Sequence, residues 1–231
     1  MSKTYLDFNK KYWEKGYSAP NVDHNTFRFY GRILKPQFNL PNNNEKLLDF
    51  GCGQGSAVNY FHQQGFDAEG VDMSEKDTSI AKELFPHLKD KFSICNPDPK
   101  LQQSYGSQKK YKVITAFQSL YYFTKSDFEF LLESLNNQLE AGGIFFATMM
   151  GTLSKEFYEN SIKTDDEYLR KVDFKNDRVN CKDYYMFFIE NEDDLLEKFK
   201  IFKPIHTGYY CSKFRSDEGD GFHYNFCGMK K

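Results

Sequence analysis

The chain has 231 residues, a length typical of one domain, and its formal net charge is −2. Its 31 basic residues are balanced by 33 acidic ones, so no excess of positive charge is available to neutralise phosphates, which disfavours a dedicated nucleic-acid binder. The 24 phenylalanines and 16 tyrosines provide enough ring area for a core although aliphatic residues are few. A chain that is largely disordered is therefore excluded.

The cysteines and the apolar runs of the sequence indicate in which cellular compartment the protein is expected. Five cysteines are odd in number, widely spaced and without a Cys-x-x-Cys pair, so they fit neither a disulfide framework nor a zinc site. The amino terminus has no apolar stretch after a basic one, and the longest apolar run, 144–150, is too short to span a bilayer. We therefore predict a cytoplasmic protein with reduced thiols, no metal and no membrane partner.

Residues 1–44 precede the first predicted strand. Phe27, Tyr30 and Leu34 lie at the i, i+3, i+7 spacing of one helix face, and Pro41 with three asparagines separates this segment from the first strand. We predict an amino-terminal helical cap over a ligand crevice. We expect this cap to be needed more for use of an acceptor than for the fold of the sheet.

Between residues 45 and 150, apolar strand-like segments alternate with amphipathic helical ones. This alternation predicts a doubly wound, Rossmann-like α/β sheet that is mostly parallel. Capping boxes begin helices at Ser74 and Ser126, and Gly142-Gly143 ends the second of these. The predicted strands are 46–50, 66–72, 92–95, 111–117 and 144–149.

The remaining residues come after the fifth predicted strand. Residues 151–190 are charged and weakly periodic, and we predict an insertion that is helical over 153–180. Asn191 then caps a short helix, and strands at 201–210 and 222–228 predict a carboxyl-terminal antiparallel hairpin. The fold class predicted is thus a seven-stranded sheet in a single domain over 1–231.

The strongest motif is Asp49-Phe50-Gly51-Cys52-Gly53-Gln54-Gly55, in which a strand ends in spaced glycines that lead into a helix. Glycines let the backbone turn sharply and approach a ligand, and the helix amino end presents free N–H groups. Asp72 closes the next strand, where a carboxylate can accept both hydroxyl protons of a ribose. The arrangement predicts a nucleoside-cofactor site.

The glycine spacing selects among nucleoside cofactors. A dinucleotide fingerprint has its third glycine six positions into the run, where this chain has Ser56, so the spacing disfavours a nicotinamide dinucleotide. Asp49 suits the cationic amino-acid end of S-adenosylmethionine better than a pyrophosphate. Asp49-x-Gly51-x-Gly53-x-Gly55 therefore resembles the first motif of the class I S-adenosylmethionine-dependent methyltransferases.

This resemblance covers residues 45–150 and implies roles for several side chains. It implies that Gly51, Cys52, Gly53 and Gly55 form the cofactor loop, that Asp72 holds the ribose and that Met73 lies against adenine. It places Asn96 where the family usually has an Asp on the adenine amino group. It places residues 117–122, which include Phe117 and Tyr121, at the methyl-transfer crevice, and it implies that an arginine of the cap, Arg32, binds the methionine carboxylate.

Two side chains are candidates for a catalytic base. His24 stands on a polar turn of the cap, and the Tyr121 hydroxyl comes after the fourth strand. For Tyr121 ordinary packing is the alternative, and for Arg28 and Arg32, spaced i, i+4, a solvated helix face is the alternative. Proximity of acceptor and methyl group without a protein base is also open.

The balanced charge and the cap favour a closed pocket for a small molecule. We predict O- or N-methylation of a small polar metabolite or sugar-like acceptor. The richness in Phe, Tyr, Asn and Lys is typical of an AT-rich bacterial genome, and the overall sequence resembles bacterial methyltransferases, some of them in surface-polysaccharide pathways. The alternatives are an RNA or protein methyltransferase and a nicotinamide-dependent oxidoreductase, and the oligomeric state is left open.

Overall fold

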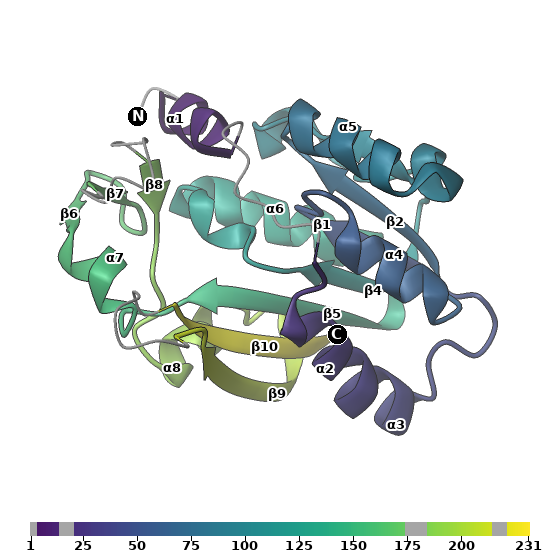
Figure 1. Cartoon of the computed structure of the whole chain (residues 1–231). Helices are drawn as coiled ribbons and strands as arrows, with labels where there is room; N and C mark the ends of the chain where they lie inside the picture. Colours follow the sequence, from purple (N-terminus) through teal and green to yellow (C-terminus); the bar gives the residue numbers. More distant parts are fainter. Residues whose placement is uncertain (1–3, 14–20, 174–183, 214–220) are drawn as a thin grey trace.

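A seven-stranded sheet forms the centre of the computed structural model, which describes residues 4–13, 21–173, 184–213 and 221–231. The strand order is β3-β2-β1-β4-β5-β10-β9 (Figure 1). Strands β1 to β5 pair in parallel, whereas β10 runs antiparallel to both β5 and β9. This confirms the predicted doubly wound sheet with a carboxyl-terminal antiparallel hairpin. The strands are β1 (Lys46–Phe50), β2 (Asp67–Asp72), β3 (Phe92–Ile94), β4 (Tyr111–Ala116), β5 (Leu139–Met150), β9 (Phe202–Cys211) and β10 (Phe222–Lys230).

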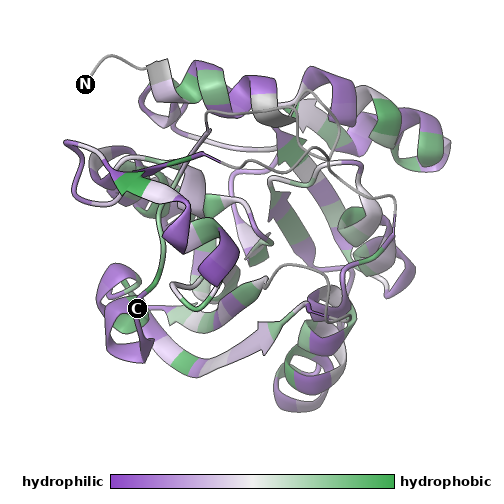
Figure 2. Ribbon diagram, turned by 60° about the vertical axis from the view of Figure 1, so that its left-hand side comes forward, coloured by the Kyte–Doolittle hydropathy of each residue, from purple (hydrophilic) through white to green (hydrophobic). Residues whose placement is uncertain are grey.

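Helices cover both faces of the sheet, and alternate strand residues face opposite layers. Leu47 and Val113 pack with the layer that contains α4, whereas Leu48 and Ile114 pack with the layer that contains α6. Figure 2 shows hydrophobic residues along the central strands and a mixture of hydrophobic and hydrophilic residues along the helices. The first layer holds α2 (His24–Phe29), α3 (Lys35–Phe38), α4 (Ser56–Gln63) and α5 (Glu75–Leu84), and the second holds α6 (Lys125–Gln138) and α8 (Glu192–Lys198).

Short 3-10 turns lie between these elements, at η2 (Pro86–Lys91), η3 (Pro99–Leu101) and η4 (Leu120–Tyr122). Two predicted boundaries near α6 were wrong. The side chain that caps α6 is Thr124, which accepts the Asp127 N–H, and not Ser126. Gly142 and Gly143 lie inside β5, where the pairing with β4 shifts register between Tyr111 and Val113. The extra residues of this irregularity accommodate the glycines within the strand.

The amino-terminal cap is helical, as predicted, and Leu34 of the predicted face is buried, but Phe29 takes the buried place predicted for Phe27. A π-helical turn, η1 (Tyr30–Leu34), joins α2 to α3 and adds a residue to the turn. Consequently Phe29 is buried, with its ring stacked on Phe146 at 4.3 Å between centroids, whereas Phe27 is 47% exposed. Phe29 and Leu34 belong to the core, so this part of the cap is also a layer of the fold.

The first helix, α1 (Thr4–Trp13), packs beside β8 (Tyr184–Met186), on the other side of the molecule from α2 and α3 (Figure 1). Its buried Asn9 donates to the carbonyls of Tyr122 and Tyr185, both at 3.0 Å, and accepts the Tyr185 N–H at 2.8 Å. Such a fully bonded buried amide fixes where the helix docks. The helix therefore joins the turn after β4 to the segment near β8.

The insertion after β5 differs from its prediction. Residues 155–159 form a short helix, α7 (Lys155–Glu159), but a three-stranded antiparallel sheet comes after it. The strands are β6 (Ser161–Lys163), β7 (Arg170–Val172) and β8, each three residues long. Such short strands leave no measurable alternation in the sequence, so the prediction of a helix there was wrong. Residues 174–180 of the prediction lie outside the described part of the chain.

No helix among the described residues is long and apolar enough to cross a membrane.

Candidate cofactor and acceptor site

The glycine loop lies at the carboxyl end of β1, where β1 is flanked by β2 and β4. Gly51, Gly53 and Gly55 all have positive φ, at 76°, 50° and 81°. The N–H groups of Gly51 and Cys52 donate to the Val71 carbonyl at 2.8 and 3.1 Å, which ties the loop to β2. The loop therefore has the left-handed backbone that favours glycine, as its sequence predicts.

The three glycines have different surroundings. A Cβ on Gly51 would lie 2.3 Å from the Ser119 Cβ, so the loop and the segment after β4 approach each other closely. A Cβ on Gly55 would lie 2.6 Å from the Phe92 ring, on the core side of the loop. Gly51 and Gly53 line a cavity at this edge of the sheet, but Gly55 does not. Gly55 caps α4 and thereby starts the helix after the loop.

Asp49 lies beneath the loop and is only 2% exposed. It accepts a hydrogen bond of 2.7 Å from the Thr115 hydroxyl on β4. Burial raises the pKa of the Asp49 carboxyl to about 7, and the charge of Asp72 adds to the increase while Thr115 opposes it. A cation bound next to Asp49 would favour its ionised form.

Asp72 ends β2 and is tied to the loop. Its carboxylate accepts the N–H groups of Gly53 and Ser74, each at 2.8 Å. Burial raises its pKa to about 6, the backbone hydrogen bonds lower it, and the charge of Asp77 raises it further. Each oxygen keeps a lone pair beyond its backbone bond, so the carboxylate can accept hydrogen bonds from the two hydroxyls of a ribose.

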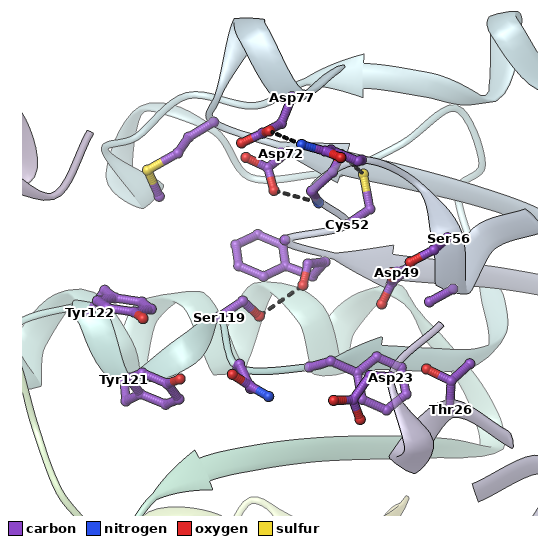
Figure 3. Close-up of a pocket in the computed structure, with 18 of the residues that line it drawn as sticks. Asp23, Thr26, Asp49, Cys52, Ser56, Asp72, Asp77, Ser119, Tyr121 and Tyr122 are labelled. Atoms are coloured by element: carbon purple, nitrogen blue, oxygen red, sulfur yellow. Dashed lines mark hydrogen bonds between the residues drawn. The ribbon is translucent and has the colours of Figure 1, made fainter. Parts of the chain in front are cut away.

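These groups face the cavity, whose volume of about 630 Å³ is within the range of small-molecule sites. Figure 3 shows Asp72 and Asp77 on one wall and Tyr121 and Asp23 on the opposite wall. The lining brings together nine predicted site residues: His24, Asp49, Gly51, Cys52, Gly53, Asp72, Met73, Phe117 and Tyr121.

Besides Gly55, two predicted site residues lie outside the lining. Asn96 is exposed, and its side-chain oxygen accepts the Asp98 N–H at 2.9 Å within a turn. The residue after β3 that lines the cavity is instead Cys95. Arg32 is exposed on the η1 turn and, like Arg28, is absent from the lining. The π-helical turn directs that face of the cap toward solvent, so their predicted roles have no support in the geometry.

The segment after β4 forms much of the second wall. Gln118 has a positive φ of 52°, its N–H donates to the Thr148 hydroxyl at 2.8 Å, and its amide donates to the Tyr210 hydroxyl at 3.1 Å. The Ser119 hydroxyl donates to the Phe50 carbonyl at 2.8 Å. This bonding holds a strained backbone in place at the cavity, a feature concentrated at functional sites.

The amino end of α2 closes the cavity from the side of the cap. Asp23 caps the helix by accepting the Asn25 N–H at 2.8 Å, and the Ser56 hydroxyl donates to the Asn21 carbonyl at 3.2 Å. His24 packs edge-on against the Tyr210 ring at 4.7 Å. Among the described lining residues there are four aspartates and no lysine or arginine, so the cavity favours a cationic ligand.

Several lining residues were missed in the sequence. Gln118 and Ser119 are not among these, because they belong to the run 117–122 that the resemblance places at this crevice. Met150, Phe157 and Met186 carry no local signal, because the end of β5, α7 and β8 meet only through the tertiary fold.

Comparison with known proteins gives the family. Residues 22–191 match the family model described as a methyltransferase domain. A viral protein whose name assigns it as a methyltransferase, 235L of Invertebrate iridescent virus 6, is 23% identical over 169 residues. The match covers 71% of this chain and 60% of that protein, so the chain spans about 60% of the length of this relative.

Solved structures share the fold. A SAM-dependent methyltransferase from Anabaena variabilis superposes with a TM-score of 0.68 at 17% identity, over 98% of this chain and 95% of that one. Magnesium protoporphyrin IX methyltransferase from Synechocystis, solved with bound SAM, gives 0.61 at 12% identity, over 98% and 97%. With the family match over most of the length, the chain belongs to the class I S-adenosylmethionine-dependent methyltransferases.

Proposed function

We propose that the protein transfers a methyl group from S-adenosylmethionine to an oxygen or nitrogen atom of a small molecule. The observation that carries this proposal is one cavity with two different walls. One wall is formed by the glycine loop, Asp72 and Met73, and the other by residues after β4 and β5. When bound, S-adenosylmethionine supplies a methyl carbon whose bond to sulfur breaks, with both electrons remaining on sulfur, as the acceptor lone pair bonds to it, and the proton of the acceptor O–H or N–H group leaves to water.

The residues of the first wall fit this cofactor. Asp72 is placed to accept the ribose hydroxyls, Met73 supplies an apolar surface for adenine, and buried Asp49 supplies negative charge for the ammonium group. The backbone of Gly51 and Gly53 allows close approach because neither carries a side chain. Arg32 is exposed, so the carboxylate of the cofactor would be held by another group that lines the cavity, such as His24.

The second wall favours a small acceptor with a polar group and an apolar face. Gln118, Ser119 and Tyr121 provide amide and hydroxyl groups, and Met150 and Phe157 provide apolar contact. Polar metabolites and sugar-like rings combine both surfaces. The absence of lysine and arginine from the described lining disfavours an RNA acceptor, whose phosphates need positive charge.

A metabolite screen with a labelled methyl donor tests the proposal. We expect transfer of label to a compound in the small-molecule fraction of a cell extract, and loss of transfer in Asp72→Ala. The exposed substitution Arg32→Ala is the matched control and should retain transfer. Label found only in RNA or protein would overturn the acceptor class, and calorimetry showing no binding of S-adenosylmethionine would overturn the function.

A further inference from the structure

His223 lies directly behind the second wall of the cavity, although it is not one of the residues that line the cavity. It is the second residue of β10 and pairs with Met150 on β5 and with Tyr210 on β9. Because β10 runs antiparallel to β5, its first residues meet the carboxyl end of β5, where the cavity opens. The side chain is 3% exposed, so both ring nitrogens need partners within the protein.

The partners of the ring determine which nitrogen carries the proton. Nδ1 lies 3.0 Å from the Gly221 carbonyl oxygen, which can only accept a hydrogen bond, so Nδ1 bears the hydrogen. Burial lowers the pKa of His223 to about 4, while the hydrogen bond with the Gly221 carbonyl and the charge of Asp23 oppose this shift and the charge of His24 adds to it, so the ring is neutral at pH 7. In a neutral imidazole protonated on Nδ1, Nε2 is an acceptor.

Nε2, the nitrogen of His223 that can accept a hydrogen bond, faces Tyr121. The Nε2 to Tyr121 hydroxyl distance is 3.5 Å, the outer limit of a hydrogen bond. The Tyr210 ring stacks on the imidazole at 4.9 Å and 6° between planes, which holds the ring in this orientation. Tyr121 itself stands on the cavity wall, with its hydroxyl group toward the cavity (Figure 3).

We propose that His223 is a positioning residue whose Nε2 accepts a hydrogen bond from the Tyr121 hydroxyl. In this orientation the Tyr121 oxygen accepts a hydrogen bond from an N–H or O–H group of the methyl acceptor. The inference rests on the proposed function and narrows it. The attacking atom must carry a hydrogen, so primary and secondary amines and hydroxyls are substrates, whereas a tertiary amine lacks the hydrogen that Tyr121 requires.

Nitrogen NMR of ¹⁵N-labelled histidine tests the arrangement without any acceptor. In the wild-type chain the His223 signals should be those of the neutral Nδ1–H form. In Tyr121→Phe the Nε2 signal should shift, while those of His206 on β9 should not, because His206 is bonded to Gln37 at 2.7 Å. A proton on Nε2, or an Nε2 signal insensitive to Tyr121→Phe, would overturn the proposal. If the protein transfers no methyl group to any acceptor, the proposed function is overturned, whereas the tautomer of His223 is still measured by this experiment.

A double-mutant cycle tests the catalytic consequence once a substrate is known. His223→Leu should lower kcat about 3- to 10-fold, the range for one lost hydrogen bond, with cofactor affinity unchanged. His223→Gln, whose side-chain oxygen can accept the Tyr121 proton, should restore most of the rate. In a Tyr121→Phe background His223→Leu should cause no further loss. His206→Leu is the control, and full additivity of the two losses would overturn the proposal by showing that His223 acts independently of Tyr121.

Discussion

The Thr115 hydroxyl on β4 donates a hydrogen bond of 2.7 Å to the Asp49 carboxylate on β1, and the two residues are paired across the parallel strands. This single bond from Thr115 does not offset the loss of water around a carboxylate that is 2% exposed. The pKa of Asp49 is therefore raised to about 7. The group is partly protonated at neutral pH until a cation approaches.

Binding of S-adenosylmethionine should therefore release protons. The affinity is expected to increase as the pH rises from about 5 to 8, because the ammonium group binds the ionised form of Asp49 and the ribose hydroxyls bind the ionised form of Asp72, and the pKa values of the two carboxyls are raised to about 7 and about 6. Titration calorimetry in buffers of different ionisation enthalpy counts the released protons. Asp49→Asn should weaken binding and reduce that count, and an unchanged count would show that Asp49 does not face the cation.

The same pKa values predict how stability depends on pH without ligand. The folded chain binds the Asp49 proton more tightly than the unfolded chain, in which the pKa is near its ordinary value of 3.8. This stabilisation is complete below about pH 4 and is lost as the pH rises through about 7. In chemical denaturation, the free energy of unfolding of Asp49→Asn relative to wild type should therefore increase between pH 5 and 8, and a constant difference would contradict the prediction.

Asp72 has both a binding role and a structural one. Because its carboxylate accepts the N–H groups of Gly53 and Ser74, Asp72→Ala should weaken cofactor binding and also lower the melting temperature. Hydrogen bonds to a charged group contribute about 1.5–3 kcal/mol each, so an affinity loss of more than about 10-fold is expected. Asp72→Asn, which retains one acceptor oxygen, should lose less in both measurements. Full affinity in Asp72→Ala would exclude the ribose role.

The parts of the site that the sequence predicts are those set by local rules. The glycine loop and Asp72 were found because a strand, a turn and a helix start are encoded within a few residues. The alternation of strands and helices likewise predicted the parallel sheet, because a helix that connects two strands of one sheet returns the chain so that the second strand runs parallel to the first. Asn96 is not among the lining residues, because its side-chain oxygen accepts the Asp98 N–H within the turn after β3.

The features that the sequence could not predict depend on contacts between distant elements. His223 carries no signal of a functional role in the local sequence, since only the antiparallel pairing of β10 with β5 brings it to Tyr121. The predicted face of the cap was wrong at Phe27 because a π-helical turn changes the 3.6-residue period. The small sheet of β6, β7 and β8 consists of strands too short to give a pattern.

Gly51 and Gly142 form a matched pair for testing the loop. Both have positive φ, at 76° and 66°, so a side chain at either position costs about 1–2 kcal/mol in backbone strain. A Cβ on Gly142 meets nothing within 4 Å, whereas one on Gly51 would overlap Ser119. Gly51→Ala should therefore destabilise the fold well beyond Gly142→Ala in denaturant titrations. Ser119→Gly should recover part of that loss, and equal effects at the two glycines would show that the close contact is unimportant.

The last prediction concerns whether the cap is only a lid or also part of the core. Phe29 is 2% exposed and stacks on Phe146, whereas Phe27, two residues away on the same helix, is 47% exposed. Loss of a buried phenylalanine costs about 3–5 kcal/mol through lost burial and the cavity left behind. Phe29→Ala should therefore lower the free energy of unfolding by about that amount, and Phe27→Ala by less than about 1 kcal/mol.

The same reasoning applies to removal of residues 1–44, which deletes Phe29, Leu34 and Leu40 from the core. Each fully buried side chain contributes about 1.5–3 kcal/mol, a large share of the stability of a typical domain. The truncated chain should therefore fail to give a cooperative thermal transition, contrary to the expectation that the sheet folds without its cap. A truncated chain that melts cooperatively near the wild-type temperature would show that α2 and α3 are a removable lid, and Phe29→Ala would then have little effect.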